Sequence, residues 1–311
     1  MIKILKKGYY EKDDILIRDR SGRDVSEVVS NVIFSVKMGG DPSLLNFCKM
    51  FDGFAPENLE VTQKEIDKAV KSVPKDVLET LQEAADRIAA YHSKQVKEGY
   101  TLEDNGVVLK QRVLPLEKVG LYIPGGTAAY PSTVLMNAIP AKIANVGEII
   151  MVSPPTANGE ISPVILAAAK IAGVDRIFKV GGAQAVAALA YGTETIPRVD
   201  KIVGPGNAYV AEAKKQVFGQ VGIDMIAGPS EVLVLADKSG DADIIAADML
   251  SQAEHDKMAT AVMITTDIFL AERVAEQIEM QLSQLPREEI ARESIEVNGK
   301  IIIADSMDEA I

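Results

Sequence analysis

The pattern of apolar and polar positions changes near residue 115. Before that point it is mainly helical: apolar residues recur at helical spacing after residues 41–43 and after Thr62, and residues 75–97 are long, charged and amphipathic. Asn105-Gly106 separates two short runs of strand-forming residues and predicts a β-hairpin. The first third of the chain is therefore predicted to be helical with one hairpin.

From residue 119 onward, short apolar runs alternate with helical segments. The predicted strands are residues 119–123, 148–153, 176–180, 201–203, 231–236, 261–265 and 301–304. Predicted helices separate them, among them residues 163–172, 208–217, 241–254 and 268–282. Such alternation is typical of an α/β fold with parallel sheets and helices on both faces.

A capping-box pattern lies close to the last residue. Ser306-Met307-Asp308-Glu309 has the composition that opens a helix, and the sequence stops two residues later at Ile311. Because this helix start is followed by only two residues, we expect that Ile311 is not a natural domain end.

Composition narrows the possible partners and the compartment. The 33 basic and 45 acidic residues give a net charge of −12, which argues against a nucleic-acid partner. The single Cys48 leaves no intrachain disulfide and is typical of a reducing compartment. The N-terminus lacks the apolar core of a signal peptide, and no run of about 18 apolar residues predicts a membrane span. We therefore expect a cytoplasmic protein.

Three glycine-containing turns follow predicted strands, at residues 124–126, 181–184 and 204–207. After parallel strands, such turns lie on the sheet edge where ligands bind, and Gln184 and Asn207 add amide donors and acceptors. None matches the dinucleotide fingerprint, since Tyr209 occupies the place of the third glycine. Glycine also serves tight turns without any ligand. The spacing alone leaves both interpretations open.

Gln252 and His255 lie three residues apart near the end of the predicted helix 241–254. At this spacing an amide oxygen and an imidazole nitrogen share one face and can reach one metal ion. Two ligands do not make a metal site, and the other histidine, His92, lies in a charged helix where a solvated or structural role is expected. Upstream, Gly228-Pro229 predicts a turn, with Ser230 just before an apolar strand.

Together these segments resemble the histidinol dehydrogenase family. The resemblance is carried by residues 119–126, 180–185, 204–208, 223–231 and 251–255, in the family's order. It implies an NAD- and zinc-dependent enzyme that oxidises L-histidinol to L-histidine in two hydride removals through an aldehyde. It also implies two incomplete Rossmann-like domains packed together in an aldehyde dehydrogenase-like arrangement. The expected domains are an N-terminal arm (1–23), a first domain (24–118 with 230–311) and an inserted second domain (119–229).

The resemblance also assigns site residues, position by position. Gln252 and His255 match zinc ligands that also contact the substrate, and Ser230 matches a further substrate contact. Three residues match NAD contacts: Tyr122, Gln184 and Asn207. The family is homodimeric, and its Glu-His base pair and two further zinc ligands, an Asp and a His of the partner subunit, come after the position of Ile311. We therefore expect an incomplete zinc site, no catalytic base and no normal activity in this chain.

Two other functions stay open on the residues alone. An aldehyde dehydrogenase-like mechanism needs a reactive cysteine, but Cys48 shares a helical face with Leu44, Leu45 and Phe51 and is expected in the core. A non-catalytic α/β module would bind a nucleotide or another small molecule at the glycine turns without a metal.

Overall fold

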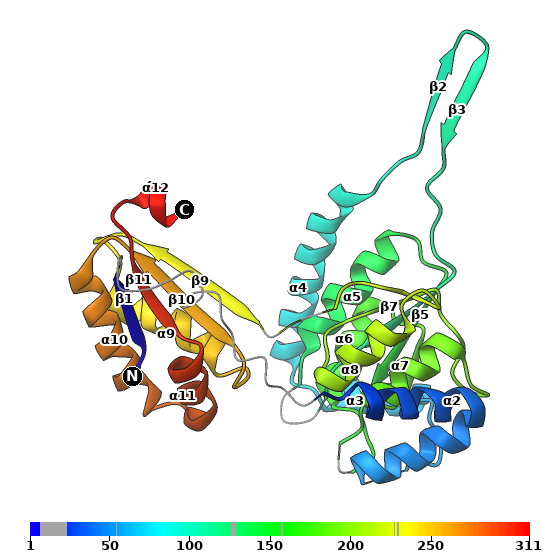
Figure 1. Ribbon diagram of the computed structural model, residues 1–311. Coiled ribbons are helices and arrows are strands. Elements are labelled where there is room, and N and C mark those ends of the chain that lie inside the picture. The colour runs from blue at the N-terminus through cyan, green and yellow to red at the C-terminus, as the bar shows by residue number, and fades with distance from the viewer. Residues whose placement is uncertain (7–23, 54, 126–128, 157, 227, 229) are drawn as a thin grey trace. The chain divides into compact units, whose positions relative to one another are not determined.

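The structure is a computed structural model that describes residues 1–6, 24–53, 55–125, 129–156, 158–226, 228 and 230–311. Its contacts divide the chain into two compact units (Figure 1). The larger unit extends from residue 24 to residue 227. The smaller one combines the N-terminal strand with residues 228–311.

The larger unit contains a five-stranded sheet. Its strands are β4 (Lys118–Tyr122), β5 (Glu148–Ser153), β6 (Arg176–Lys179), β7 (Lys201–Val203) and β8 (Gly222–Ile223). They lie in the order β6-β5-β4-β7-β8, and every neighbouring pair is parallel. The chain runs outward from β4 to β6 and then returns to the other side of β4. The sheet therefore has a topological switch point between β4 and β7, where α/β proteins usually bind ligands.

Helices cover both faces of this sheet. They are α2 (Ser26–Phe47), α3 (Gln63–Ser72), α4 (Lys75–His92), α5 (Pro131–Ile143), α6 (Pro163–Ala172), α7 (Gly182–Tyr191) and α8 (Ala208–Val217), with short turns η1 (Cys48–Asp52) and η2 (Ser93–Gln95). Ile150 and Val152 of β5 join the core under α2, α7 and α8, whereas Ile149 and Met151 join the core under α3 to α6. This division follows because successive strand side chains point to opposite faces.

A β-hairpin extends from this unit. Its strands β2 (Tyr100–Asp104) and β3 (Val107–Gln111) pair antiparallel, and Figure 1 shows them projecting away from α4 and α5. Asn105 and Gly106 both have positive φ, as a two-residue hairpin turn requires. The hairpin predicted from Asn105-Gly106 is confirmed.

The smaller unit contains a four-stranded parallel sheet. Its strands are β1 (Lys3–Lys6), β9 (Glu231–Ala236), β10 (Thr260–Thr265) and β11 (Lys300–Ile303), in the order β1-β11-β10-β9. Its helices are α9 (Ala242–Ala253), α10 (Ile268–Leu282), α11 (Glu288–Val297) and α12 (Met307–Ala310). With this second parallel sheet, the predicted α/β class with two Rossmann-like sheets is confirmed.

Some element boundaries differ from the prediction. The sequence predicts a helix capped by Ser132 or Thr133, whereas helix α5 begins at Pro131, because a proline at the first helical position is already fixed at a helical φ. Helix α4 ends at His92 rather than near Lys97. The short strands β1 and β8 and the helix α11 were not predicted. No helix in the described ranges is long and apolar enough to cross a membrane.

The contacts between helices group the chain differently from the domains expected from the sequence. Helix α2 packs against α7 and α8, α3 against α6, and α4 against α5, so residues 24–111 group with the five-stranded sheet. The domain scheme expected from the sequence grouped residues 24–118 with 230–311 instead. Residues 7–23 of the expected arm lie outside the described residues. Compactness by itself does not define a domain, and the expected boundaries stay a prediction.

Candidate functional site

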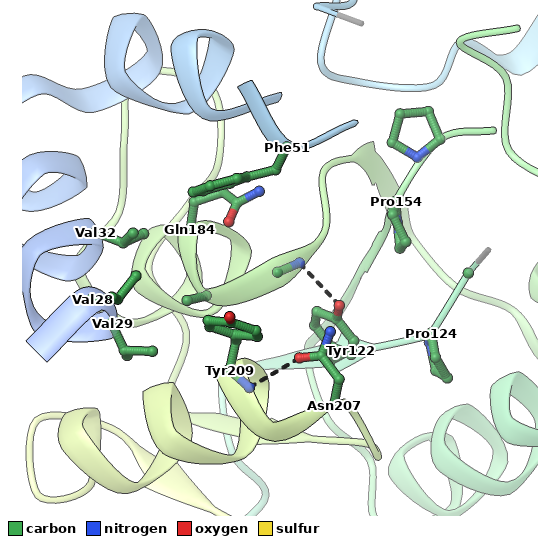
Figure 2. Close-up of a pocket in the computed structure, with 14 residues that line it drawn as sticks. Val28, Val29, Val32, Phe51, Tyr122, Pro124, Pro154, Gln184, Asn207 and Tyr209 are labelled. Atoms are coloured by element: carbon green, nitrogen blue, oxygen red, sulfur yellow. Dashed lines mark hydrogen bonds between the residues drawn. The ribbon is translucent and has the colours of Figure 1, made fainter. Parts of the chain in front are cut away.

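A cavity of about 610 Å³ opens at the switch point of the five-stranded sheet (Figure 2). The turns that follow β4, β5, β6 and β7 line it, together with α2 and η1. One wall is apolar and comes from Val28, Val29, Val32 and Phe51. The polar side chains in the lining are Tyr122, Gln184, Asn207 and Tyr209. None of the described lining residues is charged, so a ligand here meets amides, hydroxyls and apolar groups.

Tyr122 is the last residue of β4 and is almost fully buried. Its Oη accepts a hydrogen bond of 3.0 Å from the backbone N–H of Gly182, the first residue of α7 (Figure 2). The phenol therefore lies at the N-terminal end of a helix, where unsatisfied N–H groups and the helix dipole favour an electronegative partner.

Gln184 lies two residues further along α7 and is 2% exposed. Its neighbours on this helix are almost all alanines and other apolar residues, which suits a helix buried on every side. The side chain lines the cavity and forms no hydrogen bond with the described residues around it. The amide faces the cavity and offers a donor and an acceptor to a ligand there.

Asn207 caps α8. Its Oδ1 accepts hydrogen bonds of 3.1 Å from the backbone N–H groups of both Tyr209 and Val210. Asparagine is among the preferred residues for this position. The Nδ2 group has no acceptor among the described residues, and Asn207 lines the cavity. Its two N–H donors are therefore available to a ligand.

An ion pair with a buried lysine holds the turn that leads to Asn207. The Nζ of Lys214, which is 3% exposed, donates to the carbonyl of Gly204 over 3.0 Å and pairs with the carboxylate of Asp224. Asp224 in turn accepts a 2.8 Å hydrogen bond from the N–H of Gly204. Gly204 has a φ of +112°, and an added Cβ would lie 2.1 Å from the Tyr122 carbonyl oxygen. Only glycine fits between this turn and β4.

The other glycine turns of the cavity are also shaped by close packing. An added Cβ at Gly181 would lie 2.5 Å from the Cβ of Pro154, and one at Gly125 would lie 2.8 Å from its Cγ. Both turns thus press against the proline that follows β5. Gly126 of the predicted turn lies outside the described residues. Tight geometry accounts for these glycines, while the polar side chains between them face the cavity.

Gln252 and His255 lie at the end of α9 in the smaller unit. Asp241 caps this helix by accepting from the N–H of Asp243, and the N–H of His255 donates to the Gln252 carbonyl over 3.2 Å. Ser230 precedes β9, and its carbonyl accepts from the N–H of Thr260 at the start of β10. Because α9 runs back from the end of β9 to the start of β10, these three residues share the amino edge of the smaller sheet.

The residues present supply only part of a zinc site. Zinc takes four ligands, whereas Gln252 and His255 supply at most two, and the described part of the chain has no group of three or more His, Cys, Asp or Glu that could hold a metal. The Nε2 of Gln252 is buried without a hydrogen-bond partner in that same part. This N–H group suits a hydrogen-bond acceptor and not a cation, so it adds nothing to the zinc ligands, and the set of ligands stays incomplete.

Cys48 and His92 both belong to the larger unit. Cys48 is fully buried in the core under α2, as predicted. This burial leaves no access for an aldehyde to its thiol. The Nδ1 of His92 lies 2.7 Å from the Gln95 Oε1 at the end of α4, in agreement with the expected solvated or structural role.

Sequence reasoning missed four residues around the cavity: Phe51, Tyr209, Lys214 and Asp224. The sequence does contain a pattern from which the role of Lys214 could have been predicted. Val210, Ala213, Lys214 and Val217 form one buried stripe along α8, so a lysine occupies an apolar position of the helical pattern. A lysine in such a stripe needs an internal partner.

The parallel five-stranded sheet, covered by helices on both faces and with a cavity at its switch point, makes this chain a doubly wound α/β protein. A family model described as histidinol dehydrogenase matches residues 17–311. The histidinol dehydrogenase of Geobacter sulfurreducens is 54% identical over 297 residues, covering 94% of this chain and 69% of that protein. That of Clostridium acetobutylicum is 48% identical over 317 residues, covering 100% and 74%.

A solved structure gives the same result. The crystal structure of histidinol dehydrogenase from Elizabethkingia anophelis superposes with a TM-score of 0.94 at 37% identity, covering 99% of this chain and 72% of that one. The chain therefore belongs to the histidinol dehydrogenase family, whose members are oxidoreductases of histidine biosynthesis.

Proposed function

We propose that the cavity at the switch point binds NAD and that the chain contributes the cofactor-binding part of a histidinol dehydrogenase. The observation that carries this proposal is the convergence of Tyr122, Gln184 and Asn207 on one cavity at the sheet edge where parallel α/β sheets bind ligands. These are the three residues that match NAD contacts of the family. Bound NAD would accept the hydride removed from the substrate.

The cavity suits the parts of a dinucleotide. The N-terminal ends of α7 and α8 both reach it, and helix N-termini favour phosphate even where no cationic side chain is present. Val28, Val32 and Phe51 offer an apolar wall for a planar ring. The amides of Gln184 and Asn207 supply donors and acceptors that the described residues leave unused.

The substrate side of the proposal concerns the smaller unit. We infer that Ser230, Gln252 and His255 contact L-histidinol and that Gln252 and His255 are two ligands of a zinc ion. Zinc would hold the amino alcohol in place. Because the described donor set is half of what zinc requires, we assign no catalytic step to it.

Activity of these 311 residues by themselves is a separate question. By resemblance, the family's Glu-His base pair falls after the position of Ile311, and the two histidines of this sequence do not replace it. We expect the chain alone to bind NAD but not to oxidise L-histidinol at the rate of its longer relatives. By the same resemblance we propose a homodimer.

Calorimetric titration with NAD tests the cofactor assignment. We expect measurable binding to the chain and a loss of about tenfold in affinity for Gln184→Ala, since one lost pair of amide hydrogen bonds is worth about 1.4 kcal/mol. Gln82→Ala, an exposed change on α4, serves as the control. Equal NAD affinity in all three proteins would remove Gln184 from the site. Turnover of L-histidinol near the rate of the longer relatives, with NAD and zinc added, would contradict the expected lack of activity.

A further inference from the structure

Helix α11 carries two buried polar residues on one face. Ser294 is fully buried, Asn298 at the end of the helix is 6% exposed, and residues four apart on a helix lie on the same side. Two of their neighbours, Ala291 and Ile295, belong to the apolar core of the smaller unit. A serine and an asparagine thus lie where the helical pattern favours apolar residues. Buried polar groups need internal partners, and both of these find them in one loop.

That loop joins α9 to β10, and we call its residues 254–259 the His255 loop. The Oγ of Ser294 donates to the carbonyl of Ala259 over 2.9 Å, and the Nδ2 of Asn298 donates to the carbonyl of Lys257 over 3.4 Å. The bond from Ser294 is the shorter one and joins two fully buried residues, so it is the stronger of the two. Helix α11 also packs against both α9 and β10, the elements that the loop connects. The helix therefore fixes the second half of the loop.

Hydrogen bonds inside the His255 loop link Ala259 to the first residues of the loop. The N–H of Ala259 donates to the Asp256 carbonyl over 2.9 Å, and the N–H of Met258 donates to the Asp256 carboxylate over 2.8 Å. Arg287, which precedes α11, adds a longer contact of 3.4 Å from its Nη2 to the His255 carbonyl. The backbone at His255 therefore depends on where Ala259 is held.

Ala259 also lies next to the residue that holds Ser230. The N–H of Thr260 donates to the Ser230 carbonyl over 3.1 Å, where β10 begins beside β9. A displacement of Ala259 would therefore move both His255 and Ser230. One buried hydroxyl, that of Ser294, thus supports both residues.

We propose that Ser294 and Asn298 are positioning residues, which hold the His255 loop so that His255 and Ser230 keep the orientation in which they meet a ligand. Both side chains bind backbone carbonyls, so they act through the position of the loop and not by contact with the ligand. Residues that orient ligand-binding groups in this way set the affinity of a site without being part of it. The proposal rests on the roles of His255 and Ser230 in the proposed function.

Histidine NMR spectroscopy of the 311-residue chain tests the proposal, because the chain has only two histidines, His92 and His255. His255→Gln assigns the two signals, and titration with zinc alone, followed by the His255 signal, gives the affinity at this residue. We expect Ser294→Ala to shift the His255 signal and to weaken its response to zinc about fivefold, the effect of one hydrogen bond. The His92 signal should stay unchanged. The matched control is Ser283→Ala, which also removes a 2.9 Å bond from a serine to a carbonyl, but at an exposed position after α10.

Asn298→Ala is a second variant, which should shift the His255 signal and weaken the zinc response by a smaller factor, because its bond is longer. All spectra are recorded well below the melting temperature of each variant, so a general loss of stability does not affect the result. An unchanged His255 signal and zinc response in Ser294→Ala, or an equal change in Ser283→Ala, would overturn the positioning role alone. A parent chain whose His255 signal does not respond to zinc would overturn the ligand role of His255 in the proposed function, and the positioning role with it.

Discussion

The Tyr122 hydroxyl lies 3.0 Å from the backbone nitrogen of Gly182 and accepts its hydrogen bond, which ties the end of β4 to the start of α7. Dinucleotide-binding sheets usually hold a phosphate at such a helix start. In this chain a phenol occupies part of that position, and Gln184 follows two residues later on the same helix. The cavity is thus built from side-chain hydrogen bonds in place of a glycine fingerprint.

Tyr122→Phe tests this relationship. The ring keeps its packing, but the Gly182 N–H loses its acceptor and a ligand loses a hydroxyl. We expect NAD affinity to fall about fivefold, because one neutral hydrogen bond contributes about 1 kcal/mol. Calorimetric titration measures the effect, with Tyr91→Phe on the exposed side of α4 as the control. Unchanged NAD affinity in Tyr122→Phe would show that the hydroxyl is structural only.

Lys214→Met tests the clamp on the Gly204 turn. The change leaves Asp224 without its cation and the Gly204 carbonyl without its donor. We expect a loss of about 1–2 kcal/mol in unfolding free energy, since the Gly204 carbonyl loses its donor while Asp224, which is 31% exposed, keeps part of its hydration. Because the turn positions Asn207, NAD affinity should fall as well. Denaturant unfolding and NAD titration measure the two effects.

The neighbouring lysine offers a matched control for the clamp. Lys215 pairs with Glu212 on the surface of α8 and is more than half exposed. Surface pairs of this kind contribute less than about 1 kcal/mol. Lys215→Met should therefore change neither the unfolding free energy nor NAD affinity by much. Equal losses in Lys214→Met and Lys215→Met would contradict a special role for the buried lysine.

Most of the fold could be predicted from the sequence, because the apolar runs and the capping residues lie where the structure has its buried strands and its helix ends. The apolar run 149–152 becomes the buried part of the internal strand β5, and the helix predicted at 163–172 is α6, bounded by Ser162-Pro163 and Gly173. Short edge elements were missed. Strand β8 has only two residues, too few for a periodic pattern to emerge, and β1 lies near the N-terminus, outside the alternating strand and helix segments.

The cavity was only partly predictable, for a physical reason. Turn positions could be inferred from the order of strands and helices, so Gln184 and Asn207 stood out as polar residues beside glycines. Phe51 reaches the cavity from η1, far along the chain from the strands it faces. Contacts of this kind depend on how α2 packs on α7, which no local pattern encodes.

Acid stability gives a prediction that is independent of the cofactor. Arg176 binds Glu60 in a bidentate pair, with N–O distances of 2.8 and 2.7 Å, and this hydrogen bonding lowers the pKa of Glu60 from its ordinary value of 4.5. A lowered folded-state pKa stabilises the protein above the unfolded value, and that contribution is lost as pH falls through the folded value. Stability from this pair should therefore decline below about pH 4.5.

Glu60→Gln isolates that contribution. The variant should be less stable than the parent chain near neutral pH, and the difference should shrink as pH falls below about 4.5. Thermal melting across this range measures it, with the exposed Glu57→Gln as the control. A stability difference that stays constant from neutral to acid pH would show that the ion pair does not account for it.

The thermal stability of Gln252 variants tests whether this residue is a zinc ligand. Its Nε2 is buried without a partner in the described part of the chain, and an unsatisfied buried amide costs about 1–3 kcal/mol. Gln252→Met keeps the length and removes the polar group, so we expect higher thermal stability without metal. The same change should abolish any stabilisation by added zinc, which in the parent chain should be weak because two ligands leave the tetrahedron incomplete. His255→Ala, at an exposed position, should remove the zinc effect without raising stability. Melting curves with and without zinc measure both effects. A Gln252→Met variant that is less stable than the parent chain would mean that the amide has a structural partner. An unchanged response to zinc in both variants would mean that Gln252 and His255 are not ligands.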